Sequence, residues 1–176
     1  LPCDENQAIK ADQNNYVLSK VMAENISNLY RNYFDIIDIR LSNVYGPTHL
    51  NRPDIVPTLV QKALRDNGIS VWNKTPIRDF VFVQDVVNSV LALLNTDYSG
   101  PVNVGSGVGR SVGSLCDILE SLTGCRITSE DRDVTGHMEY YHDLTLLRSL
   151  TNLTEPTTLE SGLYETVKYA RELASL

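Results

Sequence analysis

Residues 36–47 have the sequence Ile36-Ile37-Asp38-Ile39-Arg40-Leu41-Ser42-Asn43-Val44-Tyr45-Gly46-Pro47. The first six are mostly apolar and β-branched, which predicts a strand buried within a sheet. Before them, from about Gln13 to Phe34, apolar residues recur at intervals of three and four, which predicts an amphipathic helix. A long helix that leads into a short apolar strand is half of a βαβ unit, so the sequence indicates an α/β fold.

A polar turn follows this strand. Ligands of open α/β sheets bind beyond the carboxyl ends of the strands, so Asn43 and Tyr45 are placed where a ligand would lie. Gly46-Pro47 is expected to turn the chain sharply. The alternative is an ordinary strand-to-loop turn in which the Asn43 side chain bonds its own backbone.

The rest of the chain alternates between amphipathic helices and short strands. Gly68 is expected to end the first of these helices, and Ser111 and Asp143 to cap two others. The predicted helices are 54–66, 85–95, 111–123, 143–149 and one from 158 onward; the predicted strands are 69–72, 78–83, 102–104 and 125–128; residues 130–142 are predicted to be irregular.

Two polar residues on the first predicted helix have the spacing of a catalytic pair. Tyr16 and Lys20 are four positions apart, so the phenol and the ammonium lie on one face. A free phenol is a poor base at neutral pH because its pKa is about 10, and a neighbouring cation favours the phenolate. The alternative is an ordinary exposed tyrosine and lysine on an amphipathic helix.

Composition excludes several classes of protein. A chain of 176 residues is long enough for one domain with a proper core. The net charge of −7 argues against a general nucleic-acid binder. No apolar run approaches the ~20 residues that span a bilayer, so no membrane partner is expected. The three cysteines lack metal-ligand spacing, so no metal site is predicted, and they fit a reducing, cytoplasmic setting.

Four short motifs occur in order: Y-x-x-x-K at 16–20, R-L-S-N-V-Y-G-P at 40–47, R-D-F-V-F-V-x-D-V at 78–86 and N-V-G-S-G at 103–107. Together they resemble the C-terminal half of the extended short-chain dehydrogenase/reductases, specifically the NAD-dependent nucleotide-sugar epimerase/dehydratase group. The resemblance implies the C-terminal part of a Rossmann-like parallel sheet plus a smaller α/β substrate-binding domain. The sequence departs from the family in the loop before Arg78, where Asn73-Lys74-Thr75-Pro76 replaces a Gly-Asp-Gly turn.

The resemblance also divides the chain. Residues 1–48 would be the end of the dinucleotide-binding domain. Residues 49–176 would be mainly the nucleotide-sugar-binding region. Within it, strand 79–83, helix 85–95 and strand 102–104 would return to the Rossmann sheet.

The resemblance assigns catalytic, cofactor-binding and substrate-binding roles to individual residues. Tyr16 would take a proton from a sugar hydroxyl, and Lys20 would lower the pKa of that tyrosine and bond the nicotinamide ribose. Ser42 would approach the nicotinamide of NAD or NADP. Asn43 would contact the sugar diphosphate, and Arg78 would pair with it, because a guanidinium fork suits two phosphate oxygens. The alternative for Arg78 is a surface pair with Asp79 or Asp85. The further substrate-binding candidates are Arg132 and Tyr140. Four more candidates are equally consistent with an ordinary place in the hydrophobic core: Ile55, Val56, Val71 and Trp72.

The expected function is that of a fragment of an NAD-dependent nucleotide-sugar epimerase or 4,6-dehydratase, which oxidises the sugar transiently at C4. The family's glycine-rich phosphate turn and catalytic Ser/Thr precede the tyrosine helix, so we expect this chain to be inactive by itself. A family member of this kind can also form a homodimer through the Tyr16 helix. One alternative is a truncated, non-catalytic module that binds a nucleotide sugar or a protein; another is a reductase of a different carbonyl substrate, which would give Arg78 no phosphates to meet.

Overall fold

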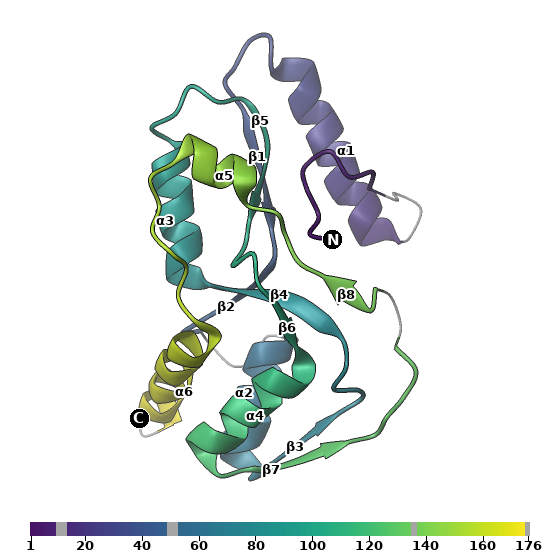
Figure 1. The fold of residues 1–176 in the computed structure, drawn as a ribbon, viewed down its shortest axis with the longest axis vertical. Coiled ribbons are helices and arrows are strands. Elements are labelled where there is room, and N and C mark those ends of the chain that lie inside the picture. The colour runs from purple at the N-terminus through teal and green to yellow at the C-terminus, as the bar shows by residue number, and fades with distance from the viewer. Residues whose placement is uncertain (10–13, 49–52, 135–136, 175–176) are drawn as a thin grey trace.

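The structure is a computed structural model that describes residues 1–9, 14–48, 53–134 and 137–174 (Figure 1). It confirms the predicted α/β class, because helices alternate with strands that pair mostly in parallel. The elements are α1 (Asn15–Tyr30), β1 (Ile37–Leu41), β2 (Asn43–Tyr45), α2 (Ile55–Arg65), β3 (Gly68–Val71), β4 (Ile77–Phe82), α3 (Val83–Leu93), β5 (Gly100–Val104), β6 (Gly109–Ser111), α4 (Val112–Thr123), β7 (Arg126–Ser129), β8 (Glu139–Tyr140), α5 (Thr145–Leu150) and α6 (Leu159–Ala174).

The strands form three groups within the described residues. β1 pairs in parallel with β5, with Ile39 opposite Val102. β2 pairs in parallel with β4, which also pairs antiparallel with β6 and parallel with β8. β3 pairs in parallel with β7. Figure 1 shows β1 and β5 in the upper half of the molecule and β3 and β7 in the lower half, with β4 running between them. The β4 strand therefore links the two halves.

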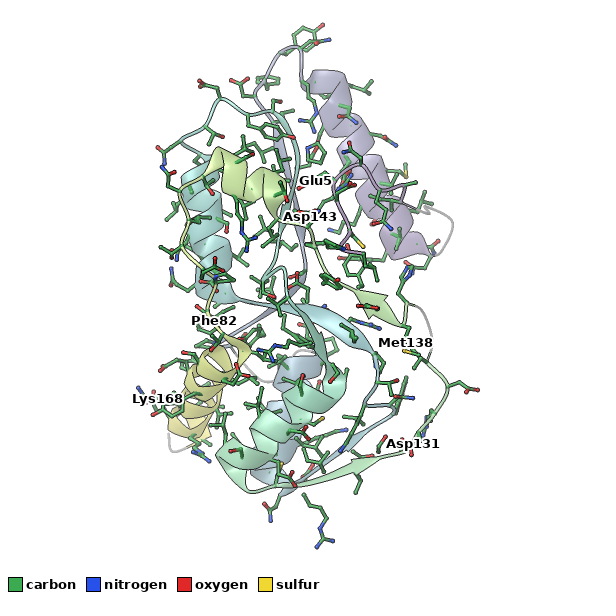
Figure 2. All side chains as sticks on the ribbon, viewed as in Figure 1. Glu5, Phe82, Asp131, Met138, Asp143 and Lys168 are labelled. Carbon is green, nitrogen blue, oxygen red and sulfur yellow. The ribbon has the colours of Figure 1, made fainter. Side chains whose placement is uncertain are left out.

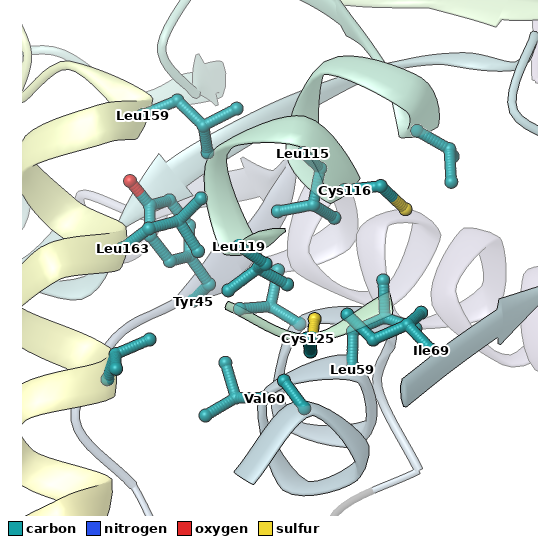
Figure 3. Packing of buried hydrophobic residues seen from close by; sticks show 14 of the residues in the cluster. Tyr45, Leu59, Val60, Ile69, Leu115, Cys116, Leu119, Cys125, Leu159 and Leu163 are labelled. Carbon is teal, nitrogen blue, oxygen red and sulfur yellow. The ribbon is translucent and has the colours of Figure 1, made fainter. Parts of the chain in front are cut away.

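Each half has its own apolar core. In the upper half, Leu93 of α3 and Val102 and Val104 of β5 pack with Leu144 and Leu147 at α5. In the lower half, helices α2, α4 and α6 enclose a larger cluster, drawn in Figure 3. Completely buried aliphatic side chains such as these typically stabilise a fold by about 1.5–3 kcal/mol each. The members of the lower cluster labelled in Figure 3 are Tyr45, Leu59, Val60, Ile69, Leu115, Cys116, Leu119, Cys125, Leu159 and Leu163.

One predicted helix cap is confirmed, and two other predicted helix ends differ from the structure. The prediction that Ser111 caps α4 is confirmed, because its Oγ accepts a hydrogen bond from the Ser114 N–H at 3.0 Å. Gly68 does not end α2. The left-handed residue there is Asn67, with φ of 49°, a conformation that asparagine tolerates, and Gly68 begins β3. Asp143 lies one residue before the N-cap of α5, where its carboxylate accepts the Thr145 N–H at 2.7 Å.

Three short strands were missed, and one of them, β2, lies in the segment after Leu41 that was predicted to be a polar turn. β8 lies within the segment 130–142 that was predicted to be irregular, and β6 immediately precedes α4. Each contains three residues or fewer, which is too short for an alternating pattern to be recognised. All three pair with β4, so they are determined by that neighbouring strand rather than by their own sequence.

The surface of α1 is unusual. None of its sixteen residues, all of them described, is buried. Large apolar side chains along α1 are exposed instead, and so are several on α3. Among the helices that the structure describes, none combines the length and apolarity needed to cross a bilayer. The exposed apolar residues are Leu18, Met22, Ile26 and Leu29 on α1 and Val83, Val87 and Leu91 on α3.

Candidate functional site

Asp79 of β4 organises the centre of the molecule. Its carboxylate is fully buried. Oδ1 accepts hydrogen bonds from the Ser106 N–H at 2.8 Å and from the Ser106 hydroxyl at 2.7 Å. Oδ2 accepts the N–H groups of Gly107 at 3.1 Å and His142 at 3.2 Å. One side chain therefore holds both the 105–107 turn and the segment before α5 against β4.

The close approach of this carboxylate explains a glycine in the turn. A Cβ on Gly105 would lie 2.4 Å from Asp79 Oδ2 and 3.1 Å from Ser42 Oγ. Any side chain at this position would push the turn away from β4. Packing against Asp79 thus accounts for Gly105 in the N-V-G-S-G motif.

Arg78 precedes Asp79 on β4, and its charge is not neutralised by a carboxylate in the described part of the chain. Its guanidinium donates to the backbone carbonyls of Ile77 at 2.8 Å and Met138 at 3.4 Å. Burial lowers the pKa of Arg78 from its usual range, because the charged form loses hydration. Asp79 is occupied by the turn, and Asp85 accepts the N–H and hydroxyl of Thr157 at 2.8 and 3.1 Å. The guanidinium therefore remains available to an anion.

Tyr140 lies beside Arg78, because the two are register partners in the β4–β8 pair. The phenol oxygen is 2.9 Å from His142 Nε2, and the two rings meet edge to face at 5.4 Å. Burial raises the pKa of Tyr140, and the nearby charge of Arg40 opposes that rise. Burial lowers the pKa of His142, so a neutral imidazole is favoured at this position.

Trp72 and Arg132 come together at the end of the β3–β7 pair. The Arg132 guanidinium lies 5.3 Å from the centre of the Trp72 ring, which is within the range of a cation–π contact. The Arg132 N–H donates to the Trp72 carbonyl at 2.9 Å, and the Asn73 amide donates to the Arg132 carbonyl at 2.9 Å. Trp72 is 64% exposed, and the Arg132 guanidinium beside it is paired with Glu130 at 2.5 Å, so an aromatic face and an ion-paired guanidinium lie side by side at the surface.

The aliphatic substrate-binding candidates lie mainly in the core. Val56 and Val71 are both buried in the lower cluster. Ile55, at the start of α2, is partly buried and packs against the same cluster. Their proposed contact with a nucleotide stays a prediction.

Tyr16 and Lys20 lie in the first turns of α1. The helix begins where the Asn14 side chain accepts the Val17 N–H at 3.0 Å. Lys20 Nζ is 5.4 Å from the centre of the Tyr16 ring, so the two side chains meet as their spacing predicts. Tyr16 is 70% exposed. Among the described residues, no carboxylate pairs with Lys20.

Ser42 and Asn43 mark the carboxyl end of β1. The Ser42 N–H donates to the Val104 carbonyl at 3.0 Å. Its hydroxyl is buried and has no hydrogen-bond partner in the described residues. The Asn43 amide donates to the Asp79 backbone carbonyl at 3.1 Å, across to β4 rather than to its own backbone. A buried hydroxyl with unused capacity therefore lies where β1 ends.

Two charged contacts tie α1 to the β1 region. Arg40 of β1 binds Glu24 through both carboxylate oxygens, at 2.9 Å from Nε and 2.7 Å from Nη2. At the other end, Arg31 pairs with Asp38 and also donates to the Ile36 carbonyl. Because α1 buries no residue, these pairs are its main anchors.

The N-terminal segment closes the same region. Arg40 donates to the Glu5 carbonyl at 2.8 Å, and Glu5 Oε1 accepts the Asn103 N–H at 2.9 Å. The Asn103 amide binds the carbonyls of Cys3 at 2.9 Å and Asp143 at 3.4 Å. Figure 2 shows Glu5 and Asp143 close together near the middle of the molecule.

Sequence reasoning missed the organising roles of Glu5, Glu24, Arg40 and Asp79. For Glu24 the spacing is misleading, since its position four residues after Lys20 predicts a pair with that lysine, whereas its carboxylate binds Arg40. In the described ranges, no group of three His, Cys, Asp or Glu side chains is arranged to hold a metal ion.

The sequence is similar to those of known nucleotide-sugar enzymes. The family model described as "NAD dependent epimerase/dehydratase family" matches residues 2–105. A dTDP-4-dehydro-6-deoxy-D-allose reductase from Streptomyces bikiniensis is 29% identical over 176 residues, covering 96% of this chain and 54% of the relative. A UDP-glucuronate 4-epimerase from Thermodesulfobacterium geofontis is 26% identical over 183 residues, covering 97% of this chain and 54% of the relative.

A solved structure shows the same arrangement. TunA, described as an NAD dependent NDP-hexosamine 5,6-dehydratase involved in tunicamycin biosynthesis, superposes with a TM-score of 0.87 at 26% identity. The match covers 98% of this chain and 58% of TunA. The chain spans about half the length of the curated relatives that it matches.

Proposed function

Because this chain belongs to the NAD dependent epimerase/dehydratase family, we propose that it supplies the nucleotide-sugar site and the catalytic tyrosine of a nucleotide-sugar epimerase or 4,6-dehydratase. The observation that carries the proposal is the Arg78 guanidinium. It is partly withdrawn from water, and the described residues give it carbonyl partners but no carboxylate.

A diphosphate satisfies such a group. A partly buried cation without a counter-ion is costly, and a guanidinium can donate two parallel hydrogen bonds to phosphate oxygens. Tyr140 is the register partner of Arg78, and Asn43 is bonded to the carbonyl of Asp79, the residue that follows Arg78. These three residues would form the diphosphate site. The names of the reductase and the 4-epimerase relatives both specify nucleotide sugars, which supports this substrate class.

Trp72 and Arg132 would then bind the nucleoside. An exposed aromatic ring offers a stacking face for a base, and the adjacent guanidinium offers donors for a ribose or phosphate oxygen. The apolar candidates Ile55, Val56 and Val71 would support this surface from the core.

Tyr16 and Lys20 would carry the proton chemistry. The Tyr16 phenolate would take the proton from the sugar C4 hydroxyl, and the ammonium of Lys20, next to the ring, would stabilise that phenolate. NAD, when bound, would supply the hydride acceptor for oxidation at C4. Lys20 and Ser42 would lie beside the nicotinamide ribose, and the Ser42 hydroxyl, which is buried without a partner in the described residues, supports this part of the proposal.

A dinucleotide-binding domain like that of the longer relatives would pack on exposed apolar residues. Val83, Val87 and Leu91 of α3 form one such surface. The exposed apolar residues Leu18, Met22, Ile26 and Leu29 on α1 would contact a second copy in a homodimer. In this division residues 1–48 would be the end of the dinucleotide-binding domain, and residues 49–176 would form mainly the nucleotide-sugar region.

Calorimetric titration of the intact protein with UDP-, dTDP-, CDP- and GDP-sugars, with and without NAD, tests the proposal. We expect one nucleotide class to bind. Arg78→Ala should weaken that binding by at least tenfold, because hydrogen bonds to charged groups contribute about 1.5–3 kcal/mol. The control is Arg126→Ala, which removes an exposed guanidinium from β7 and should leave affinity unchanged. Absence of nucleotide-sugar binding, or equal affinity in both variants, would contradict the proposal.

A non-catalytic nucleotide-sugar-binding module is the second candidate, since the Arg78 guanidinium would bind a diphosphate whether or not Tyr16 acts as a base. It predicts the same binding and the same effect of Arg78→Ala. It differs in predicting no turnover by the intact protein, so the two candidates are separated by kinetics and not by calorimetry.

A further inference from the structure

The charge partners of α1 are not those that helix spacing favours. Glu24 lies four residues after Lys20, and side chains at this spacing are neighbours that commonly form an ion pair. Both Glu24 oxygens bind Arg40 instead, at 2.9 and 2.7 Å. Lys20 is left with its ammonium beside the Tyr16 ring.

Geometry explains why Arg40 outcompetes Lys20. A guanidinium matches both oxygens of a carboxylate, whereas an ammonium offers a point charge. Arg40 is also held in place by the Glu5 carbonyl at 2.8 Å and by its position in β1. The Glu24 and Arg40 side chains are only 24% and 21% exposed, so solvent screens their attraction less than that of a surface pair. Finally, lysine placed before glutamate is the weaker order for a helical pair.

We propose that Arg40 is a positioning residue for the catalytic pair: by occupying both oxygens of Glu24, it keeps this carboxylate away from Lys20 and leaves the ammonium free for Tyr16. The inference rests on the proposed function, since it assumes that Tyr16 is the base and Lys20 its electrostatic partner.

Removing Arg40 has a specific consequence. In Arg40→Gln, Glu24 is released and can reach Lys20, four residues away. The ammonium is then shared with a carboxylate and stabilises the Tyr16 phenolate less, so the chemical step slows. In the double variant Glu24→Gln/Arg40→Gln the carboxylate of residue 24 is gone, so Lys20 is released from it.

A purely structural role predicts the opposite pattern. If the Glu24–Arg40 pair only anchored α1, the double variant would be as slow as Arg40→Gln or slower, because the anchor is missing from both. Rescue by the second substitution therefore separates the control of charge from the anchoring of the helix.

The kinetic test compares wild type, Tyr16→Phe, Arg40→Gln, Glu24→Gln and the double variant of the intact protein with its nucleotide sugar. We expect kcat of Arg40→Gln to fall about threefold or more, with KM little changed. The double variant should match Glu24→Gln and exceed Arg40→Gln. A double variant no faster than Arg40→Gln, or an Arg40→Gln variant with normal kcat, would overturn the inference. If Tyr16→Phe kept full turnover, the proposed function itself would fail, so the two failures are distinguishable.

A second measurement needs no activity. Acylation of lysines in the 176-residue chain by a small amine-reactive ester can be followed peptide by peptide by mass spectrometry. Lys20 should react about twofold more slowly in Arg40→Gln, as expected for a new helical ion pair, and return to the wild-type rate in the double variant. Lys168, which is exposed on α6, is the internal reference (Figure 2). Equal Lys20 labelling in all variants would overturn the inference.

Discussion

Replacement of Asp79 by alanine should be among the most destabilising single changes in this chain. The carboxylate is fully buried and accepts four hydrogen bonds, three of them from the backbone N–H groups of Ser106, Gly107 and His142. Asp79→Ala leaves these donors buried without an acceptor. The Ser106 hydroxyl is less affected, because it also lies 3.4 Å from the Val108 carbonyl and can rotate toward it.

The magnitude follows from these contacts. A buried donor without a partner costs about 1–3 kcal/mol, so three N–H groups amount to about 3–9 kcal/mol. Two effects reduce this sum: water can enter the space of the lost carboxylate, and the cost of burying an ionised group disappears. We therefore expect a loss of about 3–5 kcal/mol in the free energy of unfolding, against a typical total of about 5–15 kcal/mol.

Urea unfolding followed by far-ultraviolet circular dichroism measures this loss. Asp79→Asn should fall between wild type and Asp79→Ala, because one carbonyl oxygen remains to accept hydrogen bonds. The control is Asp117→Ala, an exposed position on α4, which should change stability by less than about 0.5 kcal/mol. If Asp79→Ala lost less than about 1 kcal/mol, the hydrogen bonds to Asp79 would not hold the 105–107 turn as described.

Two further predictions concern the lower core. Gly162→Ala should lower stability by about 1–3 kcal/mol despite the helix preference for alanine, because the new Cβ would lie 2.1 Å from Tyr45 Oη; a higher Tm would contradict this. Burial raises the pKa of Cys116 from 9.0 to about 11. Between about pH 9 and 11 the folded protein keeps the Cys116 proton, whereas the unfolded chain loses it. The part of the free energy of unfolding that depends on this proton is therefore complete below about pH 9. It is lost as the pH rises toward 11, with a slope of about 1.4 kcal/mol per pH unit. Urea unfolding from pH 8 to 10.5 should show wild type losing more stability than Cys116→Ala, and parallel losses would refute the assignment.

The fold could be predicted where local pattern and tertiary environment agree. The helix before residue 36 and the β-branched strand after it have strong periodic signals, and Ser111 has the chemistry of an N-cap. β2, β6 and β8 could not be predicted, because they are formed by pairing with β4. The end of α2 was misplaced because asparagine and glycine are adjacent and both tolerate a left-handed conformation.

In the candidate site, too, contacts within one helix could be predicted, whereas contacts between separate elements could not. Spacing on one helix brought Tyr16 to Lys20, and contact between them needs no other element. The Glu24–Arg40 pair joins a helix to a strand, and the Asp79 contacts join three segments, so both depend on the finished fold. Val56 and Val71 illustrate a further limit, since an apolar residue in a motif can serve the core or a ligand with the same sequence.

Turnover of the Tyr16→Phe variant of the intact protein is the most direct test of the central claim. With the nucleotide sugar identified by calorimetry, we predict that kcat falls by about 100-fold or more, the usual contribution of a positioned base, while nucleotide-sugar affinity stays close to wild type. Unchanged turnover in Tyr16→Phe would contradict the claim that this tyrosine is the catalytic base.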